Sequence, residues 1–498
     1  MEKKYFNQHL LKEQANFYNQ NYDVFKSIED NYKLDIWFLV HFRIYFSVRN
    51  QLQDSTNNPY SNGDTDLFGI VRFLFFFLRN AFKLRRKNNT RSSICVVSSG
   101  HKVKDIHVGS LRGIGYNLFL LNIPKFSGKY NHSKILDTHD FNYFNNSYWI
   151  LLRGIINIRN WRILFGLNND LKRKFDQLVF ESSNEQKFLM HLKKLRISIL
   201  FKYLEYLAYK LYFEKSGFRA VVMYDENSPS KRVIWQAASQ VGIKTFAIQH
   251  GATHSLNPAY NYANYDCPPQ FCDVTFLWGS FYEKQLLGYG YKYEKLNIQG
   301  PIPIDSIDNV GLEQKKIAWL RKYNPTNKEV ICYCSQPQKD ESLRLQQLKD
   351  VVEVMIGLPN YLLIIRPHPN ESLSYFYDYF KQHNINTSSI ILEKEVELEL
   401  HFLVSNILIT SFSTVGIEFS KYYKPIVILD YLKEDLLDYI SSGIGIAVTN
   451  KQELQELFNN KSRLAINNQN FTKFLAKYYF QPKKTVSEGI LSVIKSSV

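Results

Sequence analysis

The sequence predicts an α/β protein made of two doubly wound, Rossmann-like domains, each built around a parallel sheet. Three observations lead to this prediction. Short apolar runs rich in β-branched residues alternate with helical patterns between residues 219 and 429, as in parallel strands joined by crossover helices. The chain has 498 residues, which is too long for one core and suits two domains of about 150–250 residues. A charged, polar stretch at 306–328 separates the two alternating regions and is predicted to be an interdomain linker.

The first Rossmann-like domain is expected at 91–305, after a helical extension at 1–90. Residues 142–215 are rich in aromatic and basic side chains and show a helical pattern. A further helix is expected from Ser230 to Val241, because Gly242 follows it as a helix-ending residue. Strands are expected at Ser93–Ser98, Arg219–Tyr224, Lys244–Gln249, Val274–Trp278 and Lys295–Gln299.

The second Rossmann-like domain is expected at 329–498, and the two domains are predicted to face a central cleft. Its expected strands are Glu329–Cys334, Tyr361–Ile365, Ile390–Leu392, Ile407–Thr410 and Ile426–Leu429. The helices predicted between them are Glu341–Ile356, Ser372–His383, Glu397–Val404 and Thr414–Tyr422. In such sheets ligands collect at the carboxyl ends of the strands, where loops lead into helices.

Charge and cysteine content limit the classes of partner and compartment. The net charge of +16 indicates an anionic partner, which could be nucleic acid, anionic lipid or a phosphorylated substrate. No RNA- or DNA-binding motif accompanies the charge, so nucleic acid is not expected as a partner. The five cysteines are few, odd in number and without zinc-site spacing, which favours a reducing compartment. Residues 1–8 lack the apolar core of a signal peptide, so a cytoplasmic location is expected.

One apolar segment, Leu67–Lys87, allows two interpretations. Arg72 and Arg79 interrupt it, and it is too short to span about 30 Å of hydrocarbon. Because it ends in a basic cluster, it could lie in the surface of an anionic membrane as a peripheral anchor. It could equally be a buried helix whose basic side chains reach outward to solvent.

Polar side chains suited to holding phosphate follow two strands of the second domain. Arg366 and His368 end one apolar run, and His368 lies between two prolines that keep it out of a helix. Ser411, Ser413 and Thr414 end another run, at the expected start of a helix, where they could also be ordinary caps. Together these residues predict a site for the phosphates of a nucleotide. Ser335 and Gln336, after the first strand of this domain, and Glu418, as a ribose contact, complete the candidate donor-binding set.

Candidate general bases follow two strands of the first domain. His250 comes after the strand Lys244–Gln249 and precedes Gly251, which would let the backbone approach a ligand. Asp225 and Glu226 follow the strand Arg219–Tyr224 as adjacent carboxylates. Any of the three could deprotonate an acceptor hydroxyl. The alternative for Asp225 is to cap the helix that begins near Ser230.

Several short motifs follow one another in a definite order along the chain. They are Gln249-His-Gly251, Trp278-Gly279, Gly300-Pro301, Arg366-Pro-His-Pro369, Thr410-Ser-Phe-Ser-Thr-Val415 and Lys424-Pro425. With these motifs the chain looks like the GT-B glycosyltransferases of bacterial surface polysaccharides over roughly 220–435. It is similar to two groups that use cytidine-activated donors: the capsule sialyl and Kdo transferases, and the CDP-glycerol glycerophosphotransferases of teichoic acid synthesis.

The resemblance implies roles for these residues. It implies that His368 and the hydroxyls at 411–414 hold the donor phosphate. It also implies that His250 is the base, as in the phosphotransferases, or that Asp225 or Glu226 is, as in many sialyltransferases. The chain lacks the Trp before the His-Gly pair and the Thr-Asp-Tyr before the serine pair that the phosphotransferases show. This departure favours sugar transfer over transfer of glycerol phosphate.

The leading hypothesis is therefore a metal-independent GT-B glycosyltransferase without a cofactor. It would move a sugar from a CMP- or other nucleotide-activated donor to a growing surface polysaccharide or lipid-linked acceptor, at the inner face of the plasma membrane. The alternatives are a CDP-glycerol or polyol-phosphate transferase and, less favoured, a sugar-nucleotide 2-epimerase of the same fold. A metal-dependent GT-A enzyme would need an Asp-x-Asp motif after a strand, and the only match, Asp64-Thr-Asp66, lies in a polar loop.

Overall fold

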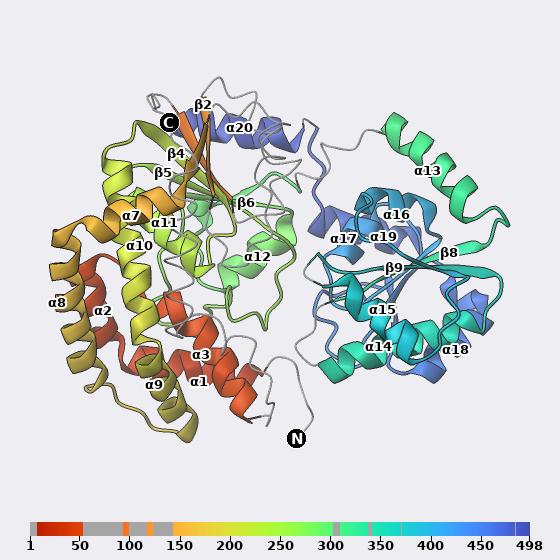
Figure 1. Ribbon diagram of the computed structural model, residues 1–498, viewed down its shortest axis with the longest axis horizontal. Coiled ribbons are helices and arrows are strands. Elements are labelled where there is room, and N and C mark those ends of the chain that lie inside the picture. The colour runs from red at the N-terminus through yellow and green to blue at the C-terminus, as the bar shows by residue number, and fades with distance from the viewer. Residues whose placement is uncertain are drawn as a thin grey trace. The chain divides into compact units, whose positions relative to one another are not determined.

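The structure is a computed structural model that describes residues 7–52, 93–98, 117–122, 143–301, 309–336, 341–369, 371–483 and 485–498. Its contacts divide the chain into two compact units. The C-terminal unit contains 309–480 together with Gly251–His254, and the N-terminal unit contains the rest of the described chain, including the segment after 480. Both units hold a parallel sheet with helices packed against it (Figure 1). The predicted α/β, GT-B-like fold class is confirmed.

The C-terminal unit is built on a six-stranded sheet in the order β10-β9-β8-β11-β12-β13. Every neighbouring pair in this sheet is parallel. This is the 3-2-1-4-5-6 order of a nucleotide-binding Rossmann sheet. The strands are β8 (Glu329–Cys334), β9 (Tyr361–Arg366), β10 (Ile390–Leu392), β11 (Ile407–Thr410), β12 (Ile426–Leu429) and β13 (Gly445–Val448).

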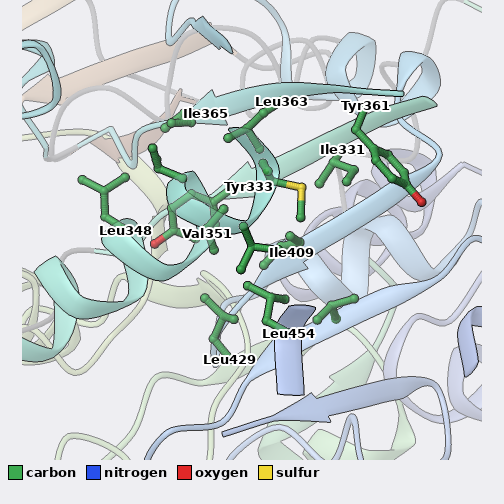
Figure 2. Packing of buried hydrophobic residues seen from close by; sticks show 14 of the residues in the cluster. Ile331, Tyr333, Leu348, Val351, Tyr361, Leu363, Ile365, Ile409, Leu429 and Leu454 are labelled. Carbon is green, nitrogen blue, oxygen red and sulfur yellow. The ribbon is translucent and has the colours of Figure 1, made fainter. Parts of the chain in front are cut away.

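Apolar side chains from strands and helices form one core in this unit (Figure 2). Ile331 and Ile409 from neighbouring strands pack with Leu348 and Val351 from a covering helix, and all four are fully or almost fully buried. Helices cover both faces of a parallel sheet, which is why its central strands are apolar at successive positions. The helices are α13 (Asn309–Tyr323), α14 (Glu341–Ile356), α15 (Leu373–Gln382), α16 (Leu398–Val404), α17 (Val415–Ser420), α18 (Lys451–Asn459) and α19 (Asn468–Tyr478).

Most of the stretch predicted as a linker, 306–328, is helix α13, which belongs to the C-terminal unit. Trp319 is buried, and its Nε1 lies 3.4 Å from Glu393 Oε2. Lys315 pairs with Glu397 at 2.8 Å on the surface. Few of the described side chains of α13 are buried, and its sequence lacks a wide apolar stripe, so the stretch resembles a polar linker.

The N-terminal unit is built on a seven-stranded parallel sheet in the order β3-β2-β1-β4-β5-β6-β7. This repeats the doubly wound order of the other unit, with one further strand at the edge. Two of its strands, β2 and β3, were not expected from the sequence. The strands are β1 (Ser93–Ser98), β2 (Asn117–Asn122), β3 (Tyr143–Asn146), β4 (Phe218–Tyr224), β5 (Lys244–Ile248), β6 (Val274–Leu277) and β7 (Leu296–Ile298).

The last helix, α20 (Val486–Ser497), packs on this N-terminal sheet, although the sequence placed all of 329–498 in the second domain. Val486, Ile490 and Ile494 are almost fully buried in one cluster with Val222 and Phe246 of the strands. The helix starts with a capping box between Thr485 and Glu488. Its apolar stripe has a period that any amphipathic helix shows, so the sequence does not reveal which sheet it covers.

The helices α1–α3 belong to the N-terminal unit rather than to a separate extension. Helix α3 is buried on most of its surface, and Phe17, Tyr18, Phe25 and Trp37 form an aromatic cluster around it. None of the helices in the described ranges is both long and apolar enough to cross a membrane. Leu67–Lys87 and Asp64-Thr-Asp66 lie outside the described residues. The helices are α1 (Gln8–Gln20), α2 (Tyr22–Tyr32), α3 (Ile36–Leu52), α7 (Ser147–Ile156), α8 (Ile158–Phe175), α9 (Ser183–Lys194), α10 (Arg196–Glu214), α11 (Pro229–Ser239) and α12 (Ser280–Gly288).

Candidate active site

The C-terminal sheet reverses its strand order between β8 and β11. From β8 the chain adds β9 and β10 on one side, and it then returns to place β11 on the other side. Ligands of open parallel sheets bind beyond the carboxyl ends of the strands at such a reversal. The residues that follow β8 are Ser335 and Gln336, and those that follow β11 are 411–414. The fold therefore brings two of the predicted donor-binding groups to the same edge of the sheet.

Glu371, a residue that the sequence did not single out, connects the loops after β8 and β9. Its side chain is buried, and its Oε2 accepts hydrogen bonds from Ser335 Oγ and, at 2.7 Å, from the His368 backbone N–H. On the other side of the reversal, Gln336 Nε2 donates to the Phe412 carbonyl at 3.1 Å. These bonds hold the loops around His368 in position. A glutamate three residues after His368 was the only signal in the sequence.

Arg366 does not stand beside His368 as an isolated phosphate ligand. Its Nη1 donates to the Val396 carbonyl at 2.8 Å and to His401 Nδ1 at 3.1 Å. His401 is fully buried, and its Nε2 lies 3.2 Å from Glu393 Oε2. Because Nδ1 accepts from the arginine, the network assigns the imidazole proton to Nε2. Through Nη1, Arg366 therefore positions the segment before and within α16, and its role in donor binding stays a prediction.

This network predicts a pH-dependent stability. Burial, together with the Arg366 charge, lowers the pKa of His401 from 6.5 to about 4. Between about pH 6.5 and pH 4, His401 is protonated in the unfolded chain but not in the folded chain. The free energy of unfolding therefore falls as the pH drops through this range. Wild-type protein should lose roughly 2–3 kcal/mol more over this window than the His401→Gln variant. Urea unfolding at several pH values measures the difference, and equal pH dependence of the two proteins would contradict it.

The loop after β11 is held by backbone and aromatic contacts. Tyr439 donates to the Ser413 carbonyl at 2.6 Å, and its ring lies so close to Gly416 that a Cβ there would be 2.6 Å from a ring carbon. Only glycine fits at this position. Ser411 is buried and donates to the Leu429 carbonyl at 3.1 Å, so its hydroxyl supports the loop.

Ser413, Thr414 and Glu418 remain candidates for ligand contact, because all three are only half-buried. Thr414 is the N-cap residue of α17, a helix of six residues, but its side chain makes no capping bond. Its Oγ1 instead accepts from the Ala252 backbone N–H at 3.1 Å. Ala252 belongs to the short segment Gly251–His254 that groups with the C-terminal unit. The glycine next to it has Thr414 Oγ1 only 3.1 Å from the position of a Cβ. The backbone at Gly251 and Ala252 therefore passes close to the side chain of Thr414.

A hollow lies at the same edge of the sheet, beyond the ends of β11 and β12. Its lining includes Ser411, Phe412, Asp430, Glu434 and Tyr439. Burial raises the pKa of Asp430, although the Glu434 backbone N–H donates to its Oδ1 at 2.9 Å. This hollow could not be predicted from a local sequence pattern, because its lining comes from three separate segments.

In the N-terminal unit, His250 is the second residue after the end of β5, and it is exposed. The preceding residue, Gln249, is joined to the end of β6. Its Oε1 accepts from the Trp278 backbone N–H at 2.8 Å, and its carbonyl accepts from Trp278 Nε1 at 3.2 Å. These hydrogen bonds therefore join the Gln-His-Gly motif to the Trp-Gly motif and fix the backbone before His250.

The two carboxylates after β4 have different surroundings. Glu226 is 2% exposed, and its oxygens accept from the Cys272 backbone N–H at 2.7 Å and from Thr275 Oγ1 at 2.8 Å. Burial raises the pKa of Glu226. A side chain enclosed in this way cannot reach an acceptor hydroxyl, so Glu226 is withdrawn as a candidate base.

Asp225 is only partly buried and lies at the carboxyl end of β4, next to the reversal between β1 and β4. Its backbone has a φ of 57°, in the left-handed region that aspartate tolerates better than most residues. Its Oδ1 accepts from Tyr260 Oη at 2.9 Å and from the Asn227 backbone N–H at 2.9 Å. Asp225 thus holds the turn after β4 but does not cap α11, whose N-cap is Ser228. Its Oδ2 lies 3.9 Å from Lys231 Nζ.

Asn227, in the turn after β4, belongs to a buried polar network centred on Arg232, which is 0% exposed. Its Nη2 donates to Asn227 Oδ1 at 2.9 Å, its Nη1 donates to the Gln270 carbonyl at 3.2 Å, and Asp35 Oδ2 lies 3.7 Å away. Tyr262 also donates to Asn227 Oδ1 at 2.9 Å. The network joins the α2–α3 turn, α11 and the loop before β6, and the sequence analysis did not identify it.

No group of three or more His, Cys, Asp or Glu side chains in the described ranges is arranged to hold a metal ion. The five cysteines are free thiols, and four of them are buried. Burial raises the pKa of Cys95 and Cys272, so these thiols stay protonated and act as small packing residues.

Two doubly wound parallel sheets in one chain, with the last helix returning to the first sheet, define a protein of the GT-B fold class. Residues 309–496 match the family model described as CDP-Glycerol:Poly(glycerophosphate) glycerophosphotransferase. The match covers less than half of the chain and includes every strand of the C-terminal unit. No curated protein matches the chain in sequence.

Solved structures of low sequence identity share the architecture. The structure of S. aureus MnaA with UDP is 13% identical, with a TM-score of 0.50, and the alignment covers 81% of this chain and 96% of that chain. A structure of the wall teichoic acid polymerase TagF, a variant soaked with CDPG, is 12% identical, with a TM-score of 0.45 and coverage of 86% and 96%. A putative UDP-N-acetylglucosamine 2-epimerase from Listeria monocytogenes is 12% identical, with a TM-score of 0.49 and coverage of 82% and 96%. At these identities the likeness concerns the fold alone.

Proposed function

We propose that this protein is a nucleotide-dependent transferase that moves a glycerol-phosphate or related polyol-phosphate unit from a CDP-activated donor to a surface polymer. The observation that carries the proposal is the family match over 309–496, which coincides with the unit whose strand ends hold the candidate donor residues. This reverses the preference drawn from the sequence. Sugar transfer had been favoured because two short motifs of the phosphotransferases are missing, but a match over a whole sheet outweighs two local departures.

In this proposal the C-terminal unit binds the cytidine nucleotide beyond the ends of β8, β9 and β11. His368 and the hydroxyls of Ser413 and Thr414 contact the phosphates, and Glu418 contacts the ribose. Support comes from their place at the reversal of strand order and from their partial exposure. Glu371 and Tyr439 take no part in binding, but they hold the two loops that carry these residues.

The chemistry follows from the donor. The acceptor hydroxyl oxygen attacks the phosphorus of the polyol phosphate, and the bond from that phosphorus to the oxygen of CMP breaks. The acceptor proton passes to His250, and CMP leaves with the bonding electron pair. Cationic side chains and backbone N–H groups stabilise the charge on the phosphate oxygens. The mechanism asks for no metal ion and no cofactor.

The His368→Ala variant should bind the donor nucleotide about 10–100-fold more weakly, because a charge-assisted contact to phosphate is worth about 1.5–3 kcal/mol. Titration calorimetry with CDP measures the change. Ser374→Ala is the control, because Ser374 lies in the first turn of α15, the helix that follows the His368 loop, and is exposed on the surface. Unchanged CDP affinity in the His368→Ala variant would place the phosphates elsewhere.

A donor screen tests the proposal as a whole. Thermal shifts with CMP, CDP, UDP, dTDP and GDP identify the base, since a bound nucleotide stabilises the fold in proportion to its occupancy. Transfer assays then compare CDP-glycerol with CMP- and UDP-activated sugars on a polymer acceptor. Stabilisation by cytidine nucleotides with transfer from CDP-glycerol supports the proposal.

Sugar transfer remains the second candidate, because the chain lacks the Trp and the Thr-Asp-Tyr that the phosphotransferases show near the two motifs. Transfer from a CMP- or UDP-activated sugar, with none from CDP-glycerol, would establish it. Either reaction uses an acceptor that is a growing polymer or is linked to lipid. We therefore also propose that the protein works in the cytoplasm at the inner face of the plasma membrane.

A further inference from the structure

Helix α8 carries apolar side chains on two faces. One face is the buried stripe that packs against the rest of the N-terminal unit. The other faces solvent: Ile158 is 73% exposed, Trp161 43% and Phe165 66%. Their spacing of three and four residues puts them on one side of the helix. Ile156, at the end of α7, is 67% exposed and continues the surface. The buried stripe is Asn160, Leu164, Leu167, Leu171 and Phe175.

We call the exposed set, Ile156, Ile158, Trp161 and Phe165, the α8 apolar face. Trp161 Nε1 donates to the Ile155 carbonyl at 2.7 Å. The indole therefore has its one polar atom satisfied and presents an apolar ring to solvent. Apolar side chains gathered in this way, on a helix whose other face already supplies the core contacts, mark an interaction surface rather than a folding requirement.

The α8 apolar face is bordered by positive charge. Arg153, Arg159 and Arg162 are exposed, and Arg159 and Arg162 each follow a residue of the face directly. No acidic residue occurs between Ser147 and Asn169. Further along the same helix, the last turn adds Lys172, Arg173 and Lys174, of which Arg173 pairs with Asp170 at 2.8 Å. The long basic side chains can keep their charges at the level of water while their methylene groups lie along an apolar phase.

We propose that the α8 apolar face docks on a bilayer that contains anionic lipid, with α8 lying in the plane of the headgroups. An amphipathic helix with aromatic and aliphatic residues on one side and arginines beside them fits this surface. A second copy of the chain fits it less well. A twofold interface would bring the arginines of one copy toward the same arginines of the other, and like charges oppose such pairing.

The inference deepens the location proposed above and rests on that part of the proposed function, but it does not depend on the transfer reaction. It also differs from the sequence-based expectation, which placed a membrane contact at Leu67–Lys87. The surface described here lies on other helices, and its side chains are placed by the structure.

Vesicle sedimentation with the full chain tests the proposal. The triple variant Ile158→Ser, Trp161→Ser, Phe165→Ser should bind vesicles of phosphatidylcholine and phosphatidylglycerol at least about tenfold more weakly than the parent. The control is Ile356→Ser with Tyr377→Ser, which removes apolar side chains that are 38% and 56% exposed in the C-terminal unit. The control variant should bind like the parent.

The charge is tested separately. Replacing Arg159 and Arg162 by glutamine should weaken binding by about fivefold for each arginine on anionic vesicles, and this loss should shrink in high salt. Binding to vesicles of pure phosphatidylcholine should be weak for every variant. Equal binding of the parent to neutral and anionic vesicles would overturn the assignment to anionic lipid.

Trp161 reports its own position. Vesicles with brominated acyl chains should quench part of the tryptophan fluorescence of the parent, and Trp161→Phe should remove that part. Trp37, Trp235, Trp278 and Trp319 are at most 5% exposed. This measurement tests whether the α8 apolar face enters the bilayer, even if the triple variant proves unstable. Identical quenching in the parent and in Trp161→Phe would overturn the proposal. So would a triple variant that turns a dimer into a monomer in solution but binds vesicles unchanged, because the face would then join two copies.

Discussion

Replacing His250 by alanine is expected to lower turnover by roughly 10²–10⁴-fold while nucleotide affinity stays close to normal. His250 is exposed at the end of β5, and the bonds between Gln249 and Trp278 fix the backbone before it. A neutral imidazole can take the acceptor proton at physiological pH. Because the loss concerns a proton transfer and not binding, it should fall on kcat rather than on the dissociation constant of CDP.

Asp225→Asn is the matched comparison for His250→Ala. The amide keeps an oxygen that can accept from Tyr260 and from the Asn227 backbone N–H, so the turn should survive. If His250 is the base, this variant should retain most of its turnover. Loss of turnover in Asp225→Asn with near-normal activity in His250→Ala would move the role of base to the carboxylate. Single-turnover kinetics with saturating donor separates the chemical step from binding.

Replacing Arg232 by methionine is expected to lower the free energy of unfolding of the N-terminal unit by about 3–5 kcal/mol. The guanidinium is fully buried and bonded to Asn227 and the Gln270 carbonyl, with Asp35 at 3.7 Å. Removing it leaves those acceptors without their buried donor. Burial already raises the pKa of Asp35 to about 7, and Arg232 opposes that rise. Without the arginine, Asp35 is driven further toward its neutral form.

The control for this prediction is Arg173→Met. Arg173 pairs with Asp170 at 2.8 Å, but its side chain is 68% exposed, so the change should cost less than about 1 kcal/mol. Chemical unfolding followed by fluorescence measures both variants. A double variant that also carries Asp35→Asn should recover part of the lost stability, because the uncompensated carboxylate is gone. Equal stability of the Arg232→Met variant and the parent would show that the network is dispensable.

Much of the fold could be predicted because strand and helix patterns are local. The runs at Glu329–Cys334 and Ile407–Thr410 were read with the bounds that the structure has, since buried parallel strands are apolar at successive positions. Less regular strands were missed. β13 (Gly445–Val448) is only partly buried at three of its four positions, so its sequence lacks the signal of a central strand.

The sequence by itself determined the fold class, the alternation of elements and the strand ends at which polar residues collect. These depend on side-chain periodicity and on residues adjacent in the chain. Only the tertiary structure decided which side chains are free to act. Ser411 and Glu226 look like ligand or base residues in the sequence, yet both are buried and bonded to partners 18 to 49 positions away. Arg366 likewise uses Nη1 to bond Val396 and His401. The same holds for α20, whose apolar stripe packs on the N-terminal sheet. Burial and hydrogen bonding depend on such distant partners, and these partners cannot be identified from a local sequence pattern.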